Sequence, residues 1–203
     1  MFAVHDNACS LAFANQSNAM TDLLYEVKTH SLRVADLCGV FAELLGWPPE
    51  DRERAQWAGY YHDLGKHFVP AEIMLKKAAL THYERDMIQT HPEEGYLRYI
   101  QMNGNKEGNP DLLICRAILE HHERIDGNGY PKKLRGDEIS ELASLVSLAD
   151  VVDALSSDRI YRKAMVYDQT VEVVQKDRGK VWPTYIADLF LNNLNLFQNI
   201  IYA

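Results

Sequence analysis

The sequence predicts an all-α domain, because every regular element that its residue pattern indicates is a helix. Between Asp22 and Leu45, apolar residues recur with the 3.6-residue period of a long amphipathic helix. Residues 142–155 read LASLVSLADVVDAL, which is apolar nearly all round and therefore typical of a helix buried in a core. Thr81 and Glu84 have the Thr-x-x-Glu spacing of a capping box, which predicts a helix N-terminus here.

Proline and glycine mark the helix ends in the first half of the chain. A second helix begins at Pro49, because proline is favoured in the first turn of a helix. This helix runs to the pair His62-Asp63, after which Gly65 is expected to let the chain turn. The pair His91-Pro92 usually marks a helix break, so the His91 imidazole is expected to lie exposed at the end of an element.

The second half of the chain continues in helices. The residues Asn-Pro-Asp at 109–111 restart a helix, which ends at the adjacent histidines His121 and His122. Beyond the buried helix, residues 168–178 and 183–198 are expected to form two packing helices.

Length and composition indicate one globular domain. The chain has 203 residues, of which 47% are hydrophobic and 25% are charged, and its formal net charge is −8. A chain of this length can bury a core of its own. The acidic balance argues against binding to nucleic acid polymers or to an anionic membrane surface. We expect residues 1–21 to be an N-terminal extension or linker and residues 22–203 to be the domain.

The sequence carries no sign of secretion or membrane insertion. No run approaches the roughly 18–20 uninterrupted apolar residues of a membrane span. The first 14 residues contain no Lys or Arg ahead of their short apolar patch, unlike a secretory signal. Cys9, Cys38 and Cys115 are odd in number and widely spaced, which suits buried, reduced thiols. These observations predict a cytoplasmic protein.

Two adjacent histidines indicate a metal site. Neighbouring helical positions point about 100° apart, so the imidazoles of His121 and His122 need a third body to gather them, and a metal ion is such a body. The alternative is an ordinary helix C-terminus, where His and Gly are common; it explains the glycines that follow but not the doubled histidine. Gly127 and Gly129 allow backbone angles closed to other residues, so the loop can hold Tyr130 over whatever the histidines bind.

Carboxylates in apolar surroundings supply further candidate ligands. The pair His62-Asp63 is costly to bury without a cation, and Asp150 lies in the middle of the most apolar helix. Glu26 and His30 lie four residues apart and so share a helix face, although a surface ion pair more often explains that spacing. Asp153 receives less weight, as a supporting or capping partner.

The candidates come from five separate segments. Any one of them would more often be structural than catalytic, so the argument depends on their conjunction. Five imidazoles and three carboxylates exceed what one ion can bind, and the lack of a thiolate favours a multinuclear Mn or Fe site over structural zinc. The candidate metal ligands are Glu26, His30, His62, Asp63, His91, His121, His122 and Asp150.

Four stretches of the chain resemble the HD-GYP family of the HD superfamily of metal-dependent phosphohydrolases. They are HDLGK at 62–66, His91, HHERIDGNGYP at 121–131 and LADVVDALSSDRIYRKAM at 148–165. The resemblance covers about residues 22–195. It implies an HD-domain helical bundle with a metal centre of two or three divalent ions, Fe or Mn, in its core. It also implies that the domain is a phosphodiesterase that hydrolyses the bacterial second messenger cyclic di-GMP to pGpG, GMP or both.

The resemblance also assigns roles to residues. It implies that Asp63 bridges two ions, one held with His30, His62 and Asp150 and the other with His91, His121 and His122. Glu26 occupies a position at which some family members supply a ligand to a third ion. The expected catalytic residues are Asp63 and Lys66, since Lys66 and the ions would offset charge on the phosphoryl oxygens. The expected substrate contacts are Lys66, Tyr130, Arg159 and Arg162.

The chain departs from the family pattern after HDLGK. Residues 67–71 read HFVPA where a small residue and Ile-Pro-Asp are usual, so His67 and Phe68 would narrow the pocket or alter the preferred substrate. Ala78-Ala79 stands where Pro-Gly is usual. A protein partner, such as a diguanylate cyclase or a sensor domain, would dock through the loop Gly129-Tyr130-Pro131. Two alternatives stay open: a cyclic di-GMP-binding or docking module with little turnover, and an HD phosphohydrolase of another nucleotide or cyclic dinucleotide.

Overall fold

The computed structural model describes residues 18–104, 110–157 and 164–202. Within these residues, every regular secondary-structure element is a helix. These residues contain no strand, only isolated bridges between Asp126 and Arg135 and between Arg178 and Trp182. The predicted all-α class is therefore confirmed. The α-helices are α1 Asn18–Leu44, α2 Pro49–Tyr61, α3 Ala71–Met74, α4 His82–Gln89, α5 His91–Asn103, α6 Leu112–Glu120, α7 Glu141–Ser156, α8 Tyr167–Asp177, α9 Thr184–Leu191 and α10 Leu194–Ile201; the 3-10 helices are η1 Leu64–Phe68 and η2 Gly136–Glu138.

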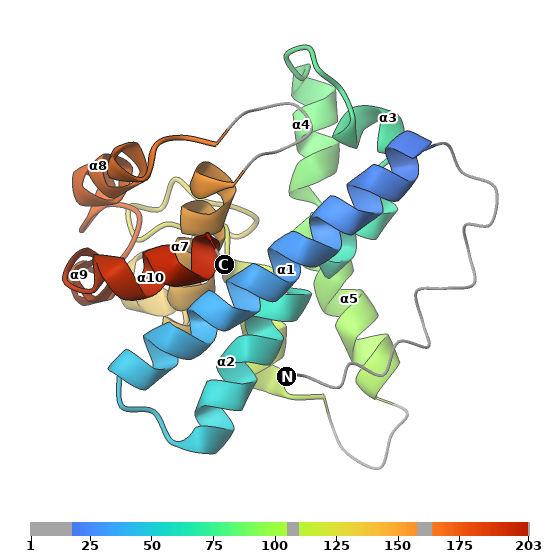
Figure 1. Ribbon diagram of the computed structural model, residues 1–203. Helices are drawn as coiled ribbons and strands as arrows, with labels where there is room; N and C mark the ends of the chain where they lie inside the picture. Colours follow the sequence, from blue (N-terminus) through green and yellow to red (C-terminus); the bar gives the residue numbers. More distant parts are fainter. Residues whose placement is uncertain (1–17, 105–109, 158–163, 203) are drawn as a thin grey trace.

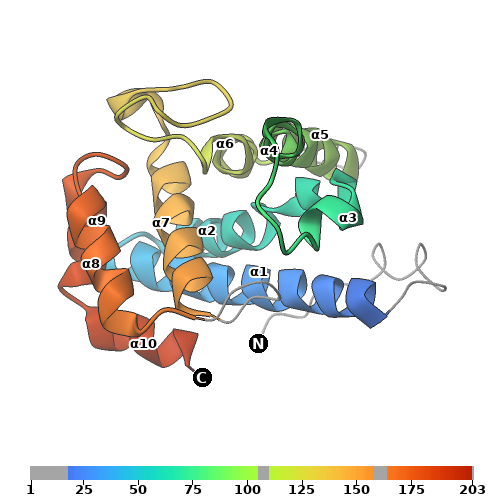
Figure 2. The ribbon, with the colours of Figure 1, turned by 90° about the horizontal axis from the view of Figure 1, so that it is seen from above.

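Helix α7 lies at the centre of the fold. It contacts α1, α2, α6, α8 and α9. The long α1 runs across the molecule beside α2, with α3 to α6 on one side of α7 and α8 to α10 on the other (Figures 1 and 2). Because its neighbours cover α7 on several sides, all the polar groups on that helix need partners within the protein.

The burial of α7 follows from its composition. Leu145, Val146, Leu148 and Ala149 are fully buried, as predicted from an apolar pattern without a polar face. The helix begins at the N-cap Ser140, whose hydroxyl accepts a hydrogen bond from the Ala143 N–H. The predicted range 142–155 therefore agrees with the observed helix to within one residue at each end.

The predicted start signals act as helix caps. Thr81 and Glu84 form the reciprocal capping box at the start of α4. At α6, the Asp111 carboxylate accepts hydrogen bonds from the N–H groups of Leu113 and Ile114. Helix α5 begins directly at His91, so the predicted break before Pro92 is confirmed. The expected exposure of His91 is wrong, because the start of α5 packs onto η1 and buries the imidazole completely.

The predicted helix over residues 183–198 is two helices. Helix α9 ends at Leu191 and α10 begins at Leu194. The side-chain amide of Asn193 donates to the backbone carbonyl of Leu189, and the Asn193 N–H donates to the carbonyl of Phe190. Asparagine competes in this way with the backbone for hydrogen bonds, which ends the helix and lets α10 turn back toward α1.

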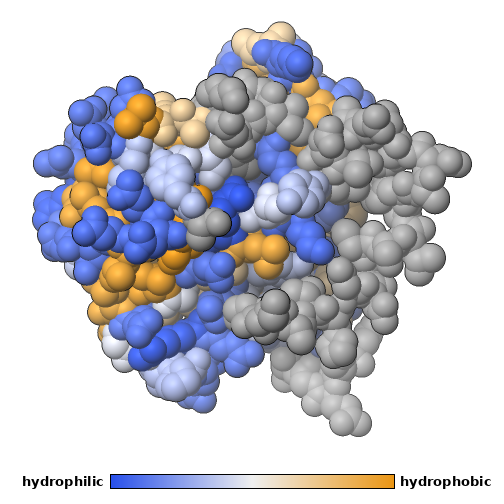
Figure 3. All heavy atoms as spheres, in the orientation of Figure 1, coloured by the Kyte–Doolittle hydropathy of each residue, from blue (hydrophilic) through white to orange (hydrophobic). Residues whose placement is uncertain are grey.

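The surface of the described residues is mixed. Hydrophilic side chains dominate the face shown in Figure 3, with apolar side chains gathered over α9 and α10. Cys38 and Cys115 are buried free thiols, as predicted, whereas Cys9 lies outside the described residues. None of the described helices combines the length and apolar character that a bilayer crossing requires.

Candidate metal centre

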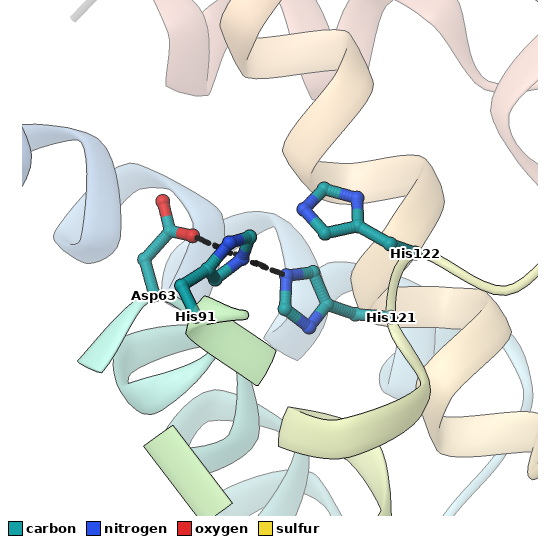
Figure 4. A group of neighbouring side chains, drawn as sticks. All are labelled: Asp63, His91, His121 and His122. Atoms are coloured by element: carbon teal, nitrogen blue, oxygen red, sulfur yellow. Dashed lines mark hydrogen bonds and ion pairs between the residues drawn. The ribbon is translucent and has the colours of Figure 1, made fainter. Parts of the chain in front are cut away.

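Seven of the eight predicted ligands meet in two adjoining groups. They come from α1, from the α2–η1 junction, from the start of α5, from the end of α6 and from α7. Within each group, one potential ligand atom per residue lies within 4.8 Å of the others. The first group is His30, His62 and Asp150, and the second is Asp63, His91, His121 and His122 (Figure 4).

Asp63 joins the two groups, because its two oxygens face different histidines. Oδ2 lies 3.2 Å from His62 Nε2 and 3.6 Å from His30 Nε2. Oδ1 lies 3.3 Å from His91 Nε2 and 4.0 Å from His121 Nε2. This arrangement suits a carboxylate that bridges two cations.

Three of the histidines are oriented by nearby backbone carbonyls. The Nδ1 atoms of His62, His91 and His121 lie 2.7, 2.7 and 2.8 Å from the backbone carbonyl three residues earlier in the chain. A carbonyl only accepts hydrogen bonds, so each Nδ1 must carry the proton. In its neutral form, each of these imidazoles directs the lone pair of Nε2 into the centre, as metal-ligating histidines do.

The resulting arrangement leaves polar atoms that a cation would satisfy. The Nε2 atoms of His91 and His121 are 3.2 Å apart, so two lone pairs face one another. Neither His62 Nε2 nor Asp63 Oδ1 forms a hydrogen bond with any atom that the structure describes, although both are buried. Ligand atoms about 2.0–2.2 Å from one ion lie about 3 Å apart from each other, which is the spacing seen here. The donor set therefore fits divalent metal ions.

Acidic side chains dominate the electrostatics of the first group. Burial alone would lower the pKa of His62, but the charge of Asp63 and the interaction with Asp150 raise it to about 10. Burial would likewise lower the pKa of His30, but hydrogen bonds to Asp150 and Asp153 raise it above its usual value. Both shifts favour the protonated form of the imidazole, whose positive charge compensates the buried carboxylates in the way that metal ions would.

The second group has the opposite character. Burial lowers the pKa of His91 to about 4, against the opposing charge of Asp63. Burial and the neighbouring imidazole of His91 lower the pKa of His122 to about 3, and His121 is shifted in the same direction. These imidazoles are neutral at physiological pH, so each has one unprotonated ring nitrogen that can bind a metal without loss of a proton.

We expect metal binding at the first group to release protons. The imidazolium of His62 must lose its proton to become a ligand, and its pKa is raised to about 10. Metal affinity should therefore fall as pH drops below about 10, by about tenfold per pH unit for each proton released. Calorimetric titration in buffers of different ionisation enthalpy measures the protons released. Affinity that stays constant between pH 6 and pH 9 would contradict the expectation.

Two glycines bring Asp63 and His91 together. A Cβ atom on Gly65 would lie 1.9 Å from the carbonyl oxygen of His91 and 2.6 Å from the N of Gly95. The chain does turn here, from α2 into η1, but Gly65 does not adopt a positive φ in that turn. Its role is close packing, since only a residue without Cβ lets η1 approach α5 at this distance.

Glu123 organises the loop that follows the two histidines. Its buried carboxylate accepts hydrogen bonds from the N–H groups of Lys132, at 2.6 Å, and Leu134, at 3.0 Å. Gly129 packs onto the backbone of residues 122–124, so it is needed for space; Gly127 has φ of +76° and does adopt the predicted special backbone angle. This role of Glu123 was not predictable from the sequence, because one glutamate in a polar loop carries no signal of burial.

The loop places Tyr130 against a ligand. The Tyr130 ring is stacked on the His122 ring, with centroids 4.7 Å apart and an interplanar angle of 26°. The Tyr130 N–H also donates to the His122 carbonyl at 3.2 Å. Tyr130 thus lies against one of the candidate ligands, and its placement over a species bound by the histidines stays a prediction.

We expect Glu123→Ala to loosen this loop. The variant removes a charged acceptor from two backbone N–H groups, which costs about 2 kcal/mol of unfolding free energy after partial solvation of those groups. Limited proteolysis should show faster cleavage within residues 126–135, and chemical denaturation should show the lower stability. Glu138→Ala is the matched control, since that exposed glutamate accepts from only one backbone N–H, that of Arg135. Equal protease resistance of the Glu123 variant and the wild type would show that the loop does not depend on the carboxylate.

Of the other predicted site residues, one lies at the centre, one lies apart from both ligand groups and two fall outside the part of the chain that the structure describes. The Lys66 ammonium lies at the centre, 2.5 Å from Asp63 Oδ2. Glu26 is partly buried on α1, one turn before His30, and is a member of neither group. Arg159 and Arg162 lie outside the described residues.

A family model described as "HD domain" matches residues 15–183, which is most of the chain. The chain belongs to the HD domain family. The resemblance to its HD-GYP branch is also confirmed, because the chain is 35% identical over 168 residues to the cyclic di-GMP phosphodiesterase response regulator RpfG of Xanthomonas campestris. That match covers 83% of this chain and 43% of the relative.

Two further similarities extend this picture of the HD domain. The chain is 30% identical over 168 residues to the 3'3'-cGAMP-specific phosphodiesterase 1 of Vibrio cholerae, covering 83% of this chain and 37% of that protein. The chain therefore spans less than half the length of these curated relatives. A solved HDG"Y"P protein of Bdellovibrio bacteriovorus, Bd1817, matches the fold with a TM-score of 0.65 and 24% identity, over 83% of this chain and 52% of that one.

Proposed function

We propose that this HD domain is a metal-dependent phosphodiesterase that hydrolyses cyclic di-GMP to pGpG, GMP or both. The observation that carries the proposal is the pair of ligand groups joined by Asp63, whose two oxygens face different histidines. Such paired sites are typical of enzymes that displace an oxygen at phosphorus. The relative named a cyclic di-GMP phosphodiesterase supports this choice of substrate.

Fe or Mn are the metals that the donor set favours, because imidazole and carboxylate ligands without thiolate suit them. A bound pair of such ions supplies a hydroxide nucleophile near neutral pH and stabilises the charge of the phosphoryl group. His30, His62 and Asp150 would hold one ion, His91, His121 and His122 the other, and Asp63 would contact both. Glu26 stays a predicted ligand of a third ion.

The remaining polar side chains of the centre would bind the substrate. Lys66 carries an ammonium beside Asp63, where it would contact a phosphate oxygen as a point charge once metal ions neutralise that carboxylate. Tyr130 presents a ring beside His122, at the partly exposed side of the second group. Arg159 and Arg162 stay predicted contacts. A nucleotide second messenger is used inside the cell, so we expect the domain to act in the cytoplasm.

The decisive experiment measures hydrolysis of cyclic di-GMP by protein prepared without oxygen and loaded with Mn or Fe. Chromatography of the products separates pGpG from GMP, and metal content is determined on the same sample. We expect a linear product from loaded protein and none from protein stripped with a chelator. Protein that binds at least two equivalents of metal and leaves cyclic di-GMP intact would refute the proposal.

A second candidate substrate is 3'3'-cGAMP, because a relative of similar identity is named for its hydrolysis. The same assay with 3'3'-cGAMP in place of cyclic di-GMP tests it. A higher kcat/KM for 3'3'-cGAMP would reassign the substrate while leaving the metal chemistry unchanged. The protein partner expected at the loop Gly129-Tyr130-Pro131 stays a separate prediction.

A further inference from the structure

His30 differs from the other histidines of the centre in the hydrogen-bond partner of its Nδ1 atom, the ring nitrogen that points away from the centre. His62, His91 and His121 each use the backbone carbonyl three residues earlier in the chain. His30 Nδ1 instead lies 2.6 Å from Asp153 Oδ2, a carboxylate on another helix. A carboxylate partner carries a full negative charge, so it increases the donor strength of the opposite ring nitrogen more than a carbonyl does.

Two acids of α7 hold the His30 ring from both sides. Asp150 and Asp153 are three residues apart and therefore lie on one face of the helix. Asp150 Oδ1 lies 3.1 Å from His30 Nε2, inside the first ligand group, and Asp153 lies on the outer side of the ring. The ring plane of His30 is thus set by α7, although the residue itself belongs to α1.

Arg33 fixes the orientation of the Asp153 carboxylate. Its Nε donates to Asp153 Oδ1 at 2.5 Å and its Nη2 donates to Oδ2 at 3.1 Å, the two-point geometry that orients a carboxylate. Ser157 adds a hydroxyl donor to Oδ1 at 3.2 Å. Arg33 lies three residues after His30 on α1, so one helix supplies both the ligand and the group that orients its partner.

We propose that Asp153 and Arg33 are positioning residues that strengthen His30 as a metal ligand. They act on the first group and leave the second group unchanged, because the second group is held by backbone carbonyls and stacking. This inference depends on the proposed metal centre and not on the identity of the cyclic dinucleotide. The competing explanation is that the Arg33–Asp153 pair only fastens α1 to α7.

The structure offers a matched control for that explanation. Glu120 is a buried carboxylate that also forms a two-point pair with an arginine, with Arg116 Nε at 2.9 Å and Nη2 at 3.2 Å. It also accepts a hydrogen bond from the Ser140 N–H and so ties α6 to the start of α7. Glu120 is a member of neither ligand group. A purely structural role of the Arg–carboxylate pair would give Asp153→Asn and Glu120→Gln the same effect on metal binding.

The test measures Zn²⁺ affinity by competition with a chromophoric chelator, in protein carrying His122→Ala. That change leaves the second group with three candidate ligands, against four for the first group when Asp63 is counted in both, so Zn²⁺ should occupy the first group more tightly. We expect Asp153→Asn to weaken Zn²⁺ binding by about 10–100-fold, the usual effect of losing the partner of a ligating histidine. Glu120→Gln should leave the affinity unchanged. Arg33→Gln should weaken it by several-fold, and Arg33→Lys should restore part of the loss, since lysine keeps the charge without the two-point geometry.

A spectroscopic measurement covers the case in which Asp153→Asn fails to fold. In zinc-loaded protein with all ligands intact, NMR should detect the His30 Nδ1 proton far downfield, and Arg33→Gln should shift that signal while those of His62, His91 and His121 stay in place. Unchanged Zn²⁺ affinity in both the Asp153 and the Arg33 variants, or an equal loss in Glu120→Gln, would overturn the inference. Wild-type protein that binds no metal would refute the proposed centre as well, which separates the two failures.

Discussion

Asp63→Asn is expected to lower the rate of cyclic di-GMP hydrolysis by more than 100-fold, because the Asp63 carboxylate faces both ligand groups. The amide keeps one oxygen but places an NH₂ donor against the histidines of one group, whichever way it turns. Loss of a residue that only supports a metal ligand typically costs about 10–100-fold, so loss of a bridging ligand should cost more. Initial rates and metal content of the same preparations measure the effect.

The control for this variant is Asp188→Asn. Asp188 is an exposed carboxylate on α9 that forms an ion pair with Arg178 and belongs to neither ligand group. Its replacement should leave the hydrolysis rate and the metal content at wild-type values. An Asp63→Asn protein that keeps two equivalents of metal and a rate within tenfold of the wild type would show that the carboxylate does not bridge.

Gly65→Ala should destabilise the fold by about 3 kcal/mol or more. The new methyl group would overlap the His91 carbonyl oxygen and the Gly95 N, and both are backbone atoms that cannot rotate away. Overpacking usually costs about 1–3 kcal/mol, and a clash between two backbones lies at the upper end of that range. Separation of η1 from α5 would also move Asp63 away from His91, so metal binding should weaken together with stability. Urea denaturation and metal titration measure the two effects.

Gly39→Ala provides the contrast. A Cβ atom at Gly39 would meet the side chain of Gln56, whose amide end can move aside. Gly39 lies inside α1, where alanine is favoured over glycine by about 1 kcal/mol. We expect this variant to be as stable as the wild type or more stable. A Gly65 variant with the same stability as the Gly39 variant would contradict the close-packing role of Gly65.

The helices were predictable because their signals are local. The apolar period of α1, the capping box at Thr81 and Glu84 and the apolar run of α7 each lie within one element, and hydrogen bonding inside a helix depends on neighbours in sequence. The break between α9 and α10 was missed, because an asparagine ends a helix only where its side chain finds a backbone partner.

The ligand set was also predictable, for a chemical reason. Histidines and aspartates in apolar helices are costly to bury without partners, so residues such as Asp63 and Asp150 stand out in the sequence itself. Residues with no such conflict gave no signal. Glu123 lies in a polar loop and Arg33 in a mixed stretch of α1, and only the folded chain shows what their side chains hold.

The sequence by itself thus determined the helical class and most helix boundaries, and it singled out the seven candidate ligands that the structure groups together. The tertiary structure decided how those ligands divide into two groups, that Asp63 faces both, and that Gly65 serves packing. It also decided that the His30 ring is oriented by the Asp153 carboxylate, whereas His62, His91 and His121 are oriented by backbone carbonyls three residues earlier in the chain. Periodicity and burial cost are properties of short segments, whereas these arrangements depend on distances between segments far apart in the chain, which a linear pattern does not contain.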